Sequence, residues 1–210
     1  MASRRVGEVA FSKVEKCNAE LFTLTYGAIV QQVLKDYEDV DATNEQLEKM
    51  GYNIGIRLID EFLAKAGVGQ CGSFAETADV IAKVGFKMFL GVTAEVVGAS
   101  ANEFTLQFSD NPLADFVELP EQYSTLAYSN MLCGVLRGAL EMVQVRRRPR
   151  TLRTPIPLPT NTHNLALIAS STQMRVQCTI TKDTLWGDEV TELRVVLKEM
   201  MEEEYIDDES

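Results

Sequence analysis

The chain has 210 residues, of which 46% are hydrophobic and 24% are charged, and its formal net charge is −11. This length and composition predict one domain with one substantial core and exclude collagen-like and disulfide-rich classes. The excess of acids disfavours binding to nucleic acids or to anionic lipids. Because the N-terminus lacks an apolar signal region and no later run could cross a bilayer, we expect a cytoplasmic protein without a transmembrane anchor.

The first part of the chain has the periodicity of helices. Residues 1–19 are charged throughout and are predicted to form an N-terminal arm. Apolar residues at helical spacing predict a helix over 20–37, and a second helix over 43–66 that begins at a Thr43 cap.

A third helix is predicted over 73–91, because Ser73 and Glu76 form a capping box and Gly91 supplies a C-terminal stop. Its apolar rows leave mainly Asp79, Lys83 and Lys87 for solvent. We therefore expect this helix to be central and largely buried.

The second part of the chain adds strands. Apolar residues alternate over 103–108, which predicts a half-buried strand, and they alternate again over 174–198, which predicts an antiparallel hairpin. Between them, 128–143 returns to helical spacing, with Gly134 and Gly138 placed to let another backbone approach closely. About four main helices followed by a late antiparallel sheet predict an α+β fold.

The segment Val145–Gln173 differs from the rest in composition. It holds five Arg, four of the six Pro and the single His of the chain, His163, and it has no Asp or Glu. Its proline spacing excludes a regular helix or a central strand. We interpret it as an insertion into a domain that spans 20–198.

Cys71 is the clearest candidate for chemistry. It lies just before the Ser73 cap, where free N–H groups and the helix dipole favour a thiolate. A buried, inert thiol is the alternative. The G-x-G-x-x-G match over 67–72 follows a predicted helix rather than a strand, so a dinucleotide site is disfavoured. A Cys–His hydrolase would depend on His163 within the insertion.

The other polar signals carry little specific chemistry. The spacing of the four cysteines matches no zinc site, so no metal is predicted. The tail, residues 199–210, carries seven acids in twelve residues and is typical of a frayed, solubilising end, with partner binding as the alternative.

Several long stretches together resemble the BET family of the TRAPP (transport protein particle) complex, at its third small core subunit. The resemblance runs from about Glu20 to Arg194 and is broken only by the insertion. The stretches are ELFTLTYGAIV, KDYEDV, EKMGYNIGIRLIDEFLA, CGSFAETADVIAKVGFKMFLG, NPLADFVELP, YSNMLCGVLRGALEMVQ and KDTLWGDEVTELR.

The resemblance implies a structural core subunit of a vesicle-tethering complex that supports guanine-nucleotide exchange on a Rab/Ypt GTPase in endoplasmic-reticulum-to-Golgi transport. It implies other TRAPP small subunits as partners in a hetero-oligomer, with a homodimer as an alternative state in isolation, and a peripheral location at the cis-Golgi and endoplasmic reticulum. It implies no autonomous active site. A stand-alone acyl-thioester enzyme or acyl carrier using Cys71 remains the alternative.

The resemblance also implies a lipid site. The cysteine that matches Cys71 carries an acyl chain, usually palmitate, which lies in an internal apolar channel. Val84 and Gly85 match positions that line the channel, and we add their neighbours Val80, Ile81 and Met88. Glu202, Glu203 and Glu204 in the acidic tail are the candidate residues that face the GTPase.

The resemblance sharpens the interpretation of the insertion. Deleting Val145–Gln173 joins Gln144 to Met174 and matches the helix-to-strand junction of the family with no residue gained or lost. Val codons begin with GT and one Gln codon ends in AG, so the ends fit intron boundaries. We therefore predict a retained intron, with a genuine surface loop as the alternative.

Overall fold

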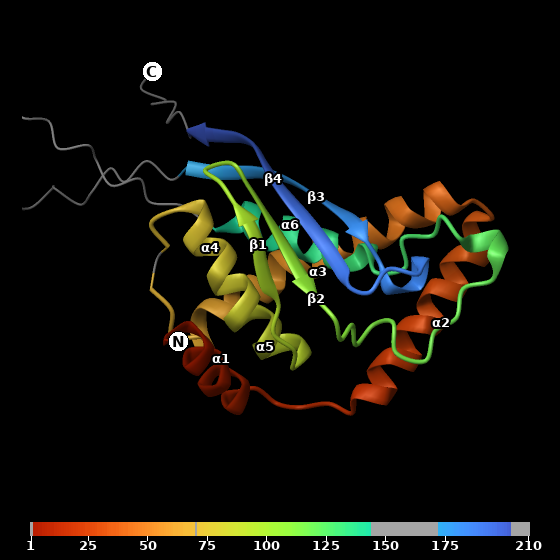
Figure 1. Cartoon of the computed structure of the whole chain (residues 1–210), viewed down its shortest axis with the longest axis horizontal. Coiled ribbons are helices and arrows are strands. Elements are labelled where there is room, and N and C mark those ends of the chain that lie inside the picture. Colours follow the sequence, from red (N-terminus) through yellow and green to blue (C-terminus); the bar gives the residue numbers. More distant parts are fainter. Residues whose placement is uncertain (1, 70, 144–171, 203–210) are drawn as a thin grey trace, which may run out of the picture.

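The structure, a computed structural model, describes residues 2–69, 71–143 and 172–202. A four-stranded antiparallel sheet lies against helices, with α3 and α6 behind it and α1, α4 and α5 beside its β1 edge (Figure 1). This arrangement confirms the predicted α+β class. The elements are α1 (Ala2–Lys13), α2 (Ala19–Tyr37), α3 (Val40–Lys65), α4 (Phe74–Val80), a π turn (Ile81–Gly85), α5 (Phe86–Leu90), β1 (Glu95–Ala99), β2 (Glu103–Phe108), α6 (Asn130–Met142), β3 (Thr172–Lys182) and β4 (Thr191–Glu202).

The sheet has the strand order β1-β2-β4-β3, with every neighbouring pair antiparallel. The residues that point into the core are the alternating apolar residues from which the strands were predicted. Leu106 lies opposite Leu193, Cys178 lies opposite Val195, and all four are buried. The alternation thus predicted β2, β3 and β4, whereas β1, with four of its five residues exposed, gave no such signal.

The helix starts follow their capping side chains. Ser73 caps α4 as predicted, because its hydroxyl accepts the Glu76 N–H at 3.1 Å. The predicted Thr43 cap is wrong, since Asp39 caps α3 by accepting the Ala42 N–H at 2.7 Å. Thr43 is buried one turn inside the helix and donates its hydroxyl to the Asp39 carbonyl. The carboxylate is the better acceptor and starts the helix earlier.

Residues predicted as an N-terminal arm include helix α1, which is part of the packed domain. Val6 and Ala10 lie one turn apart and pack with Val84 and Met88 in a second apolar cluster. The Ser3 hydroxyl donates to Asp79 Oδ2 at 2.8 Å, and Lys87 pairs with Glu8 at 3.3 Å. The apolar residues of this segment form only a short helical pattern among many charged residues. The sequence alone therefore did not predict this helix.

The helices α3 and α6 are joined by reciprocal close contacts at glycine. A Cβ added at Gly134 would fall well inside the contact distance of the Glu48 carbonyl oxygen, and one at Gly51 would meet the Met131 carbonyl in the same way. Gly138 and Gly55 continue the pattern one turn on. The close backbone approach predicted for α6 is therefore present, and α3 is the partner.

The predicted third helix is buried as expected but is not one regular helix. Ala78, Ala82, Phe86 and Met88 are buried along it. A π turn interrupts it at Ile81–Gly85, where the Phe86 N–H donates to the Ile81 carbonyl five residues earlier. The Ala94 N–H donates a hydrogen bond to the carbonyl of Ala82 at 3.0 Å.

The C-terminal boundaries also differ from the predicted ones. Strand β4 extends through Glu202, so the first four residues of the predicted frayed tail belong to the sheet. The predicted GTPase-facing residues Glu203 and Glu204 lie outside the described residues. Most of the insertion also lies outside them, and its last two residues, 172 and 173, begin β3.

Candidate functional site

An apolar cavity of about 610 Å³ lies between α3, α6 and the α4–π–α5 helix. Cys71 is in its lining, together with Val80, Ile81 and Gly85 from the interrupted helix. The volume is in the range of small-molecule ligand sites, and the lining is almost entirely aliphatic and aromatic. A site of this kind suits a flexible apolar ligand and offers one nucleophilic atom beside it.

Two of the five predicted channel residues lie elsewhere. Val84 and Met88 are fully buried in the second cluster, against Ala10 of α1 and Ala66. The sequence placed Val80, Val84 and Met88 on one row because residues four apart share a face of an α-helix. The structure keeps this row together, and it packs on the cluster beside α1. The next row, Ile81, Gly85 and Phe89, lines the cavity, and Val80 contacts both.

The other walls of the cavity come from helices that the sequence did not assign to a site. Phe62 of α3 and Val135 and Ala139 of α6 line it. The sequence of α6 contained a signal for this wall of the cavity, because its apolar residues cover more than the face that packs on the sheet. Periodicity alone does not separate a face that meets another helix from one that meets a cavity.

Cys71 is half-buried at the start of α4, and its surroundings differ from those predicted. Burial raises the pKa of the Cys71 thiol, a hydrogen bond with Thr77 opposes this shift, and the nearby Glu76 carboxylate adds to it. The Glu76 side chain also accepts the Gly72 N–H at 2.6 Å. Because burial raises the pKa and a carboxylate already occupies this N–H, the thiolate activation expected from the helix start does not dominate.

Alkylation of the free Cys71 thiol with iodoacetamide should report this environment. We expect the rate at Cys71 to rise only at a higher pH than for an ordinary cysteine, because only the thiolate reacts. Replacing Thr77 by valine removes the hydrogen bond that lowers the pKa, so the profile should move to still higher pH. Peptide mapping separates Cys71 from the exposed Cys17, which checks the reagent. A profile unchanged by the Thr77 substitution would contradict this account.

The remaining polar candidates give no second site. The 67–72 loop follows α3 rather than a strand, which is the wrong context for a dinucleotide fingerprint. His163 lies outside the described residues. Within residues 2–69, 71–143 and 172–202, no group of three His, Cys, Asp or Glu side chains is arranged to hold a metal ion. None of the helices in these ranges has the length and apolarity needed to span a bilayer.

Comparison with known proteins identifies close relatives. The trafficking protein particle complex subunit 3 of Dictyostelium discoideum is 54% identical over 200 residues, which is 94% of this chain and 92% of that protein. The transport protein particle subunit bet3 of Schizosaccharomyces pombe is 46% identical over 209 residues, which is 97% of each chain.

A solved structure agrees with these relatives. The crystal structure of a trafficking protein particle complex subunit 3 from Naegleria fowleri, covalently bound to palmitic acid, superposes with a TM-score of 0.72 at 48% identity. It covers 90% of this chain, and all of that chain is matched. Residues 22–165 also match the family described as transport protein particle (TRAPP) component. The chain is therefore a member of the TRAPP component family, in its subunit 3 (Bet3) branch.

Proposed function

We propose that this chain is a non-catalytic core subunit of a TRAPP complex and that it carries an acyl chain on Cys71. The observation that carries the lipid assignment is the presence of Cys71 in the lining of an apolar cavity of about 610 Å³. The relative from Naegleria fowleri is described as covalently bound to palmitic acid, which supports the same chemistry here.

The energetics of burial favour a structural role for such a lipid. A palmitoyl chain has about fourteen methylenes, and burial contributes about 0.8 kcal/mol for each, so the total is on the order of 10 kcal/mol. This is comparable with the stability of a whole domain. The acyl chain would fill space between α3, α6 and the interrupted helix and would act mainly as part of the core.

The intact mass of the protein from its native cells, measured with and without hydroxylamine, tests the acylation. We expect an adduct with the mass of a long-chain acyl group that hydroxylamine removes, because thioesters are cleaved by this reagent. Peptide mapping should place it on Cys71. A native preparation without a labile adduct would overturn the lipid assignment and leave the subunit role to be judged by the proteins that copurify.

A larger side chain at Gly85 is expected to exclude the lipid. Gly85→Leu places a side chain where the acyl chain would lie, whereas the Cβ of Gly85→Ala meets only Phe62 Cε2 at 3.9 Å, an ordinary contact. Overpacking typically costs about 1–3 kcal/mol. We therefore expect acyl occupancy to fall in the leucine variant and to stay at the wild-type level in the alanine variant, as measured by intact mass. Equal acyl occupancy in the leucine and alanine variants would show that Gly85 does not line the lipid site.

The alternative is a stand-alone acyl-thioester enzyme or acyl carrier that uses Cys71. The raised pKa of the thiol speaks against it, because the thiolate is the reactive species. The two roles differ in stoichiometry. Incubation with palmitoyl-CoA should give one acyl group per chain and no continued release of product, whereas repeated turnover would establish the enzyme.

In the assembly we propose that the chain supports guanine-nucleotide exchange on a Rab/Ypt GTPase, peripherally at the endoplasmic reticulum and cis-Golgi. The acidic residues Glu202, Glu203 and Glu204 are the proposed contact, since carboxylates can compete with phosphate for Mg²⁺ and backbone contacts. Replacing all three by glutamine in the reconstituted complex should slow exchange without releasing the subunit.

We further propose that Val145–Gln173 is translated intron sequence and is missing from the working protein. The segment is basic in an acidic chain, and its removal leaves the reading frame intact. Sequencing of the mature transcript across the codons for Gln144 and Met174 should show them joined. Reproducible detection in cell extracts of the tryptic peptide TPIPLPTNTHNLALIASSTQ, extended to its next basic residue, would establish a genuine loop instead.

A further inference from the structure

A second concavity of about 480 Å³ lies at the edge of the sheet, apart from the Cys71 cavity. Its lining includes every residue from Val176 to Ile180 of β3. Successive side chains of a strand point to opposite faces, so five consecutive residues line one space only if the edge of the strand opens into it. We call this space the β3 groove. Its other wall comprises Asn44, Glu48, Ala127, Asn130, Arg137 and Trp186.

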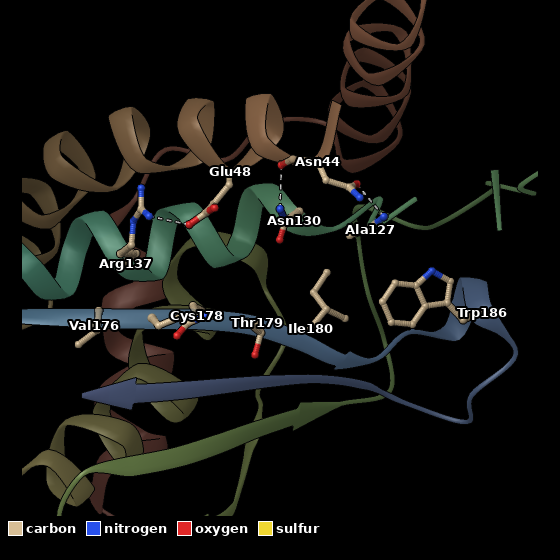
Figure 2. A pocket seen from close by; sticks show the side chains of 11 residues that line it. Asn44, Glu48, Ala127, Asn130, Arg137, Val176, Cys178, Thr179, Ile180 and Trp186 are labelled. Atoms are coloured by element: carbon tan, nitrogen blue, oxygen red, sulfur yellow. Dashed lines mark hydrogen bonds and ion pairs between the residues drawn. The ribbon is translucent and has the colours of Figure 1, made fainter. Parts of the chain in front are cut away.

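The wall opposite β3 is held by its own hydrogen bonds. Arg137 of α6 pairs with Glu48 of α3 at 2.8 Å, and the Asn130 amide donates to the Asn44 carbonyl at 2.8 Å. Figure 2 shows the ion pair toward the Val176 end of the groove and Trp186 beyond Ile180 at the other end. Trp186 donates its indole N–H to the Leu126 carbonyl at 3.0 Å, and 39% of its surface stays exposed. The groove is therefore formed before any ligand binds.

The two edges of the sheet are not equivalent. At β1 the pairing register shifts between Val96 and Ala99, and Gly98 has a φ of +72°, so this edge is bulged. At β3 the shifts fall on either side of the groove, between Arg175 and Val176 and between Ile180 and Lys182. The intervening sequence VQCTI has neither a charge nor a proline. Bulges, charges and prolines are among the features that protect sheet edges, and the groove stretch lacks these three.

We propose that the β3 groove binds an extended segment of a partner protein, which adds a fifth strand to the sheet at Val176–Ile180. This inference rests on the proposed role as an assembly subunit. Backbone amides of the segment would pair with the open edge of β3 over about 16 Å, the length of five residues in a strand. Trp186 and Ile180 would receive one large apolar side chain. The net charge of −11 favours a segment of net positive charge.

Hydrogen exchange of the full chain, alone and within its native assembly, tests the proposal. The assembly is isolated through a tag on this chain. We expect backbone amides of 176–180 to exchange about tenfold more slowly in the assembly, because a paired edge is protected from solvent. The opposite edge, β1, is the internal control and should not change. Unchanged exchange at β3 overturns the inference. If no other protein copurifies with the chain, the proposed function as an assembly subunit is overturned. The inference, which rests on that function, is then overturned as well.

Cross-linking determines the conformation of the bound segment. With p-benzoylphenylalanine placed in turn at the exposed positions Gln177 and Thr179, paired strands should give cross-links to partner residues that are also two apart. Cross-links three or four residues apart would indicate a docked helix and would overturn the strand proposal. Trp186→Ala should weaken partner retention about tenfold. Val97→Ala, which trims an exposed side chain on the β1 edge, is the matched control.

Discussion

Removing the acyl chain that we propose on Cys71 is expected to lower the free energy of unfolding by at least about 3 kcal/mol, which is about 6–12 °C in the thermal midpoint of a chain of this size. The full burial value of the chain is larger, but the empty cavity can collapse in part and the unfolded state also shelters apolar groups. Thermal unfolding before and after hydroxylamine treatment, with intact mass as the measure of deacylation, provides the comparison.

Cys71→Ser supplies the control for this effect. The variant never forms the thioester, so its midpoint should match that of the deacylated wild type and should not change with hydroxylamine. Its fold should persist, because repacking or non-covalent lipid can fill part of the cavity. If the acylated and deacylated proteins unfold at the same temperature, the lipid does not contribute to the core.

Gly134→Ala is expected to destabilise the protein by about 3–5 kcal/mol, the range reached when a core cannot relax around an added group. Helix propensity alone predicts the opposite sign, because alanine is favoured over glycine by about 0.5–1 kcal/mol within a helix. The added Cβ would, however, collide with the backbone carbonyl of Glu48, which is fixed in α3. Urea unfolding monitored by circular dichroism decides between the two signs.

The matched control for this substitution is Gly69→Ala. A Cβ at Gly69 meets no atom within 4 Å, so the midpoint should move little. An equally mild effect at Gly134 would mean that α3 and α6 can separate without cost, which would contradict the interlocked packing. Gly51→Ala tests the same contact from the α3 side and should behave like Gly134→Ala.

The fold could be predicted from sequence wherever one face of an element is buried and the other is not. Phe104, Leu106 and Phe108 alternate with half-buried neighbours, and their strand was predicted within its observed bounds. Strand β1 could not be found in this way, because it is held by pairing with β2 rather than by burial. The start of α3 was misplaced because Asp39 and Thr43 are both acceptable caps, and Asp39, the better acceptor, starts the helix one turn earlier and leaves Thr43 buried.

The candidate site was predicted in part for a similar reason. Cys71, Val80, Ile81 and Gly85 do line one cavity. Helical spacing grouped the residues into rows but did not show which row faces the cavity, and Val84 and Met88 lie on the row that packs against α1. The pKa of Cys71 could not be predicted from its position before a cap, because its direction depends on burial and on the Glu76 carboxylate. Neither is visible in the order of the residues alone.

The π turn makes the cavity depend on the number of residues in the helix as well as on their types. Each residue of an α-helix advances the direction of its side chains by about 100°. The wide turn accommodates one extra residue, so deleting one residue within Ile81–Gly85 would let the segment close as a regular helix with the later residues still in phase. The same deletion after Gly85 has no wide turn to absorb it and would rotate everything that follows relative to α1 and the cavity. A substitution scan changes side chains but never this phase. The surface that lines the cavity therefore has a determinant that only insertions and deletions can reveal.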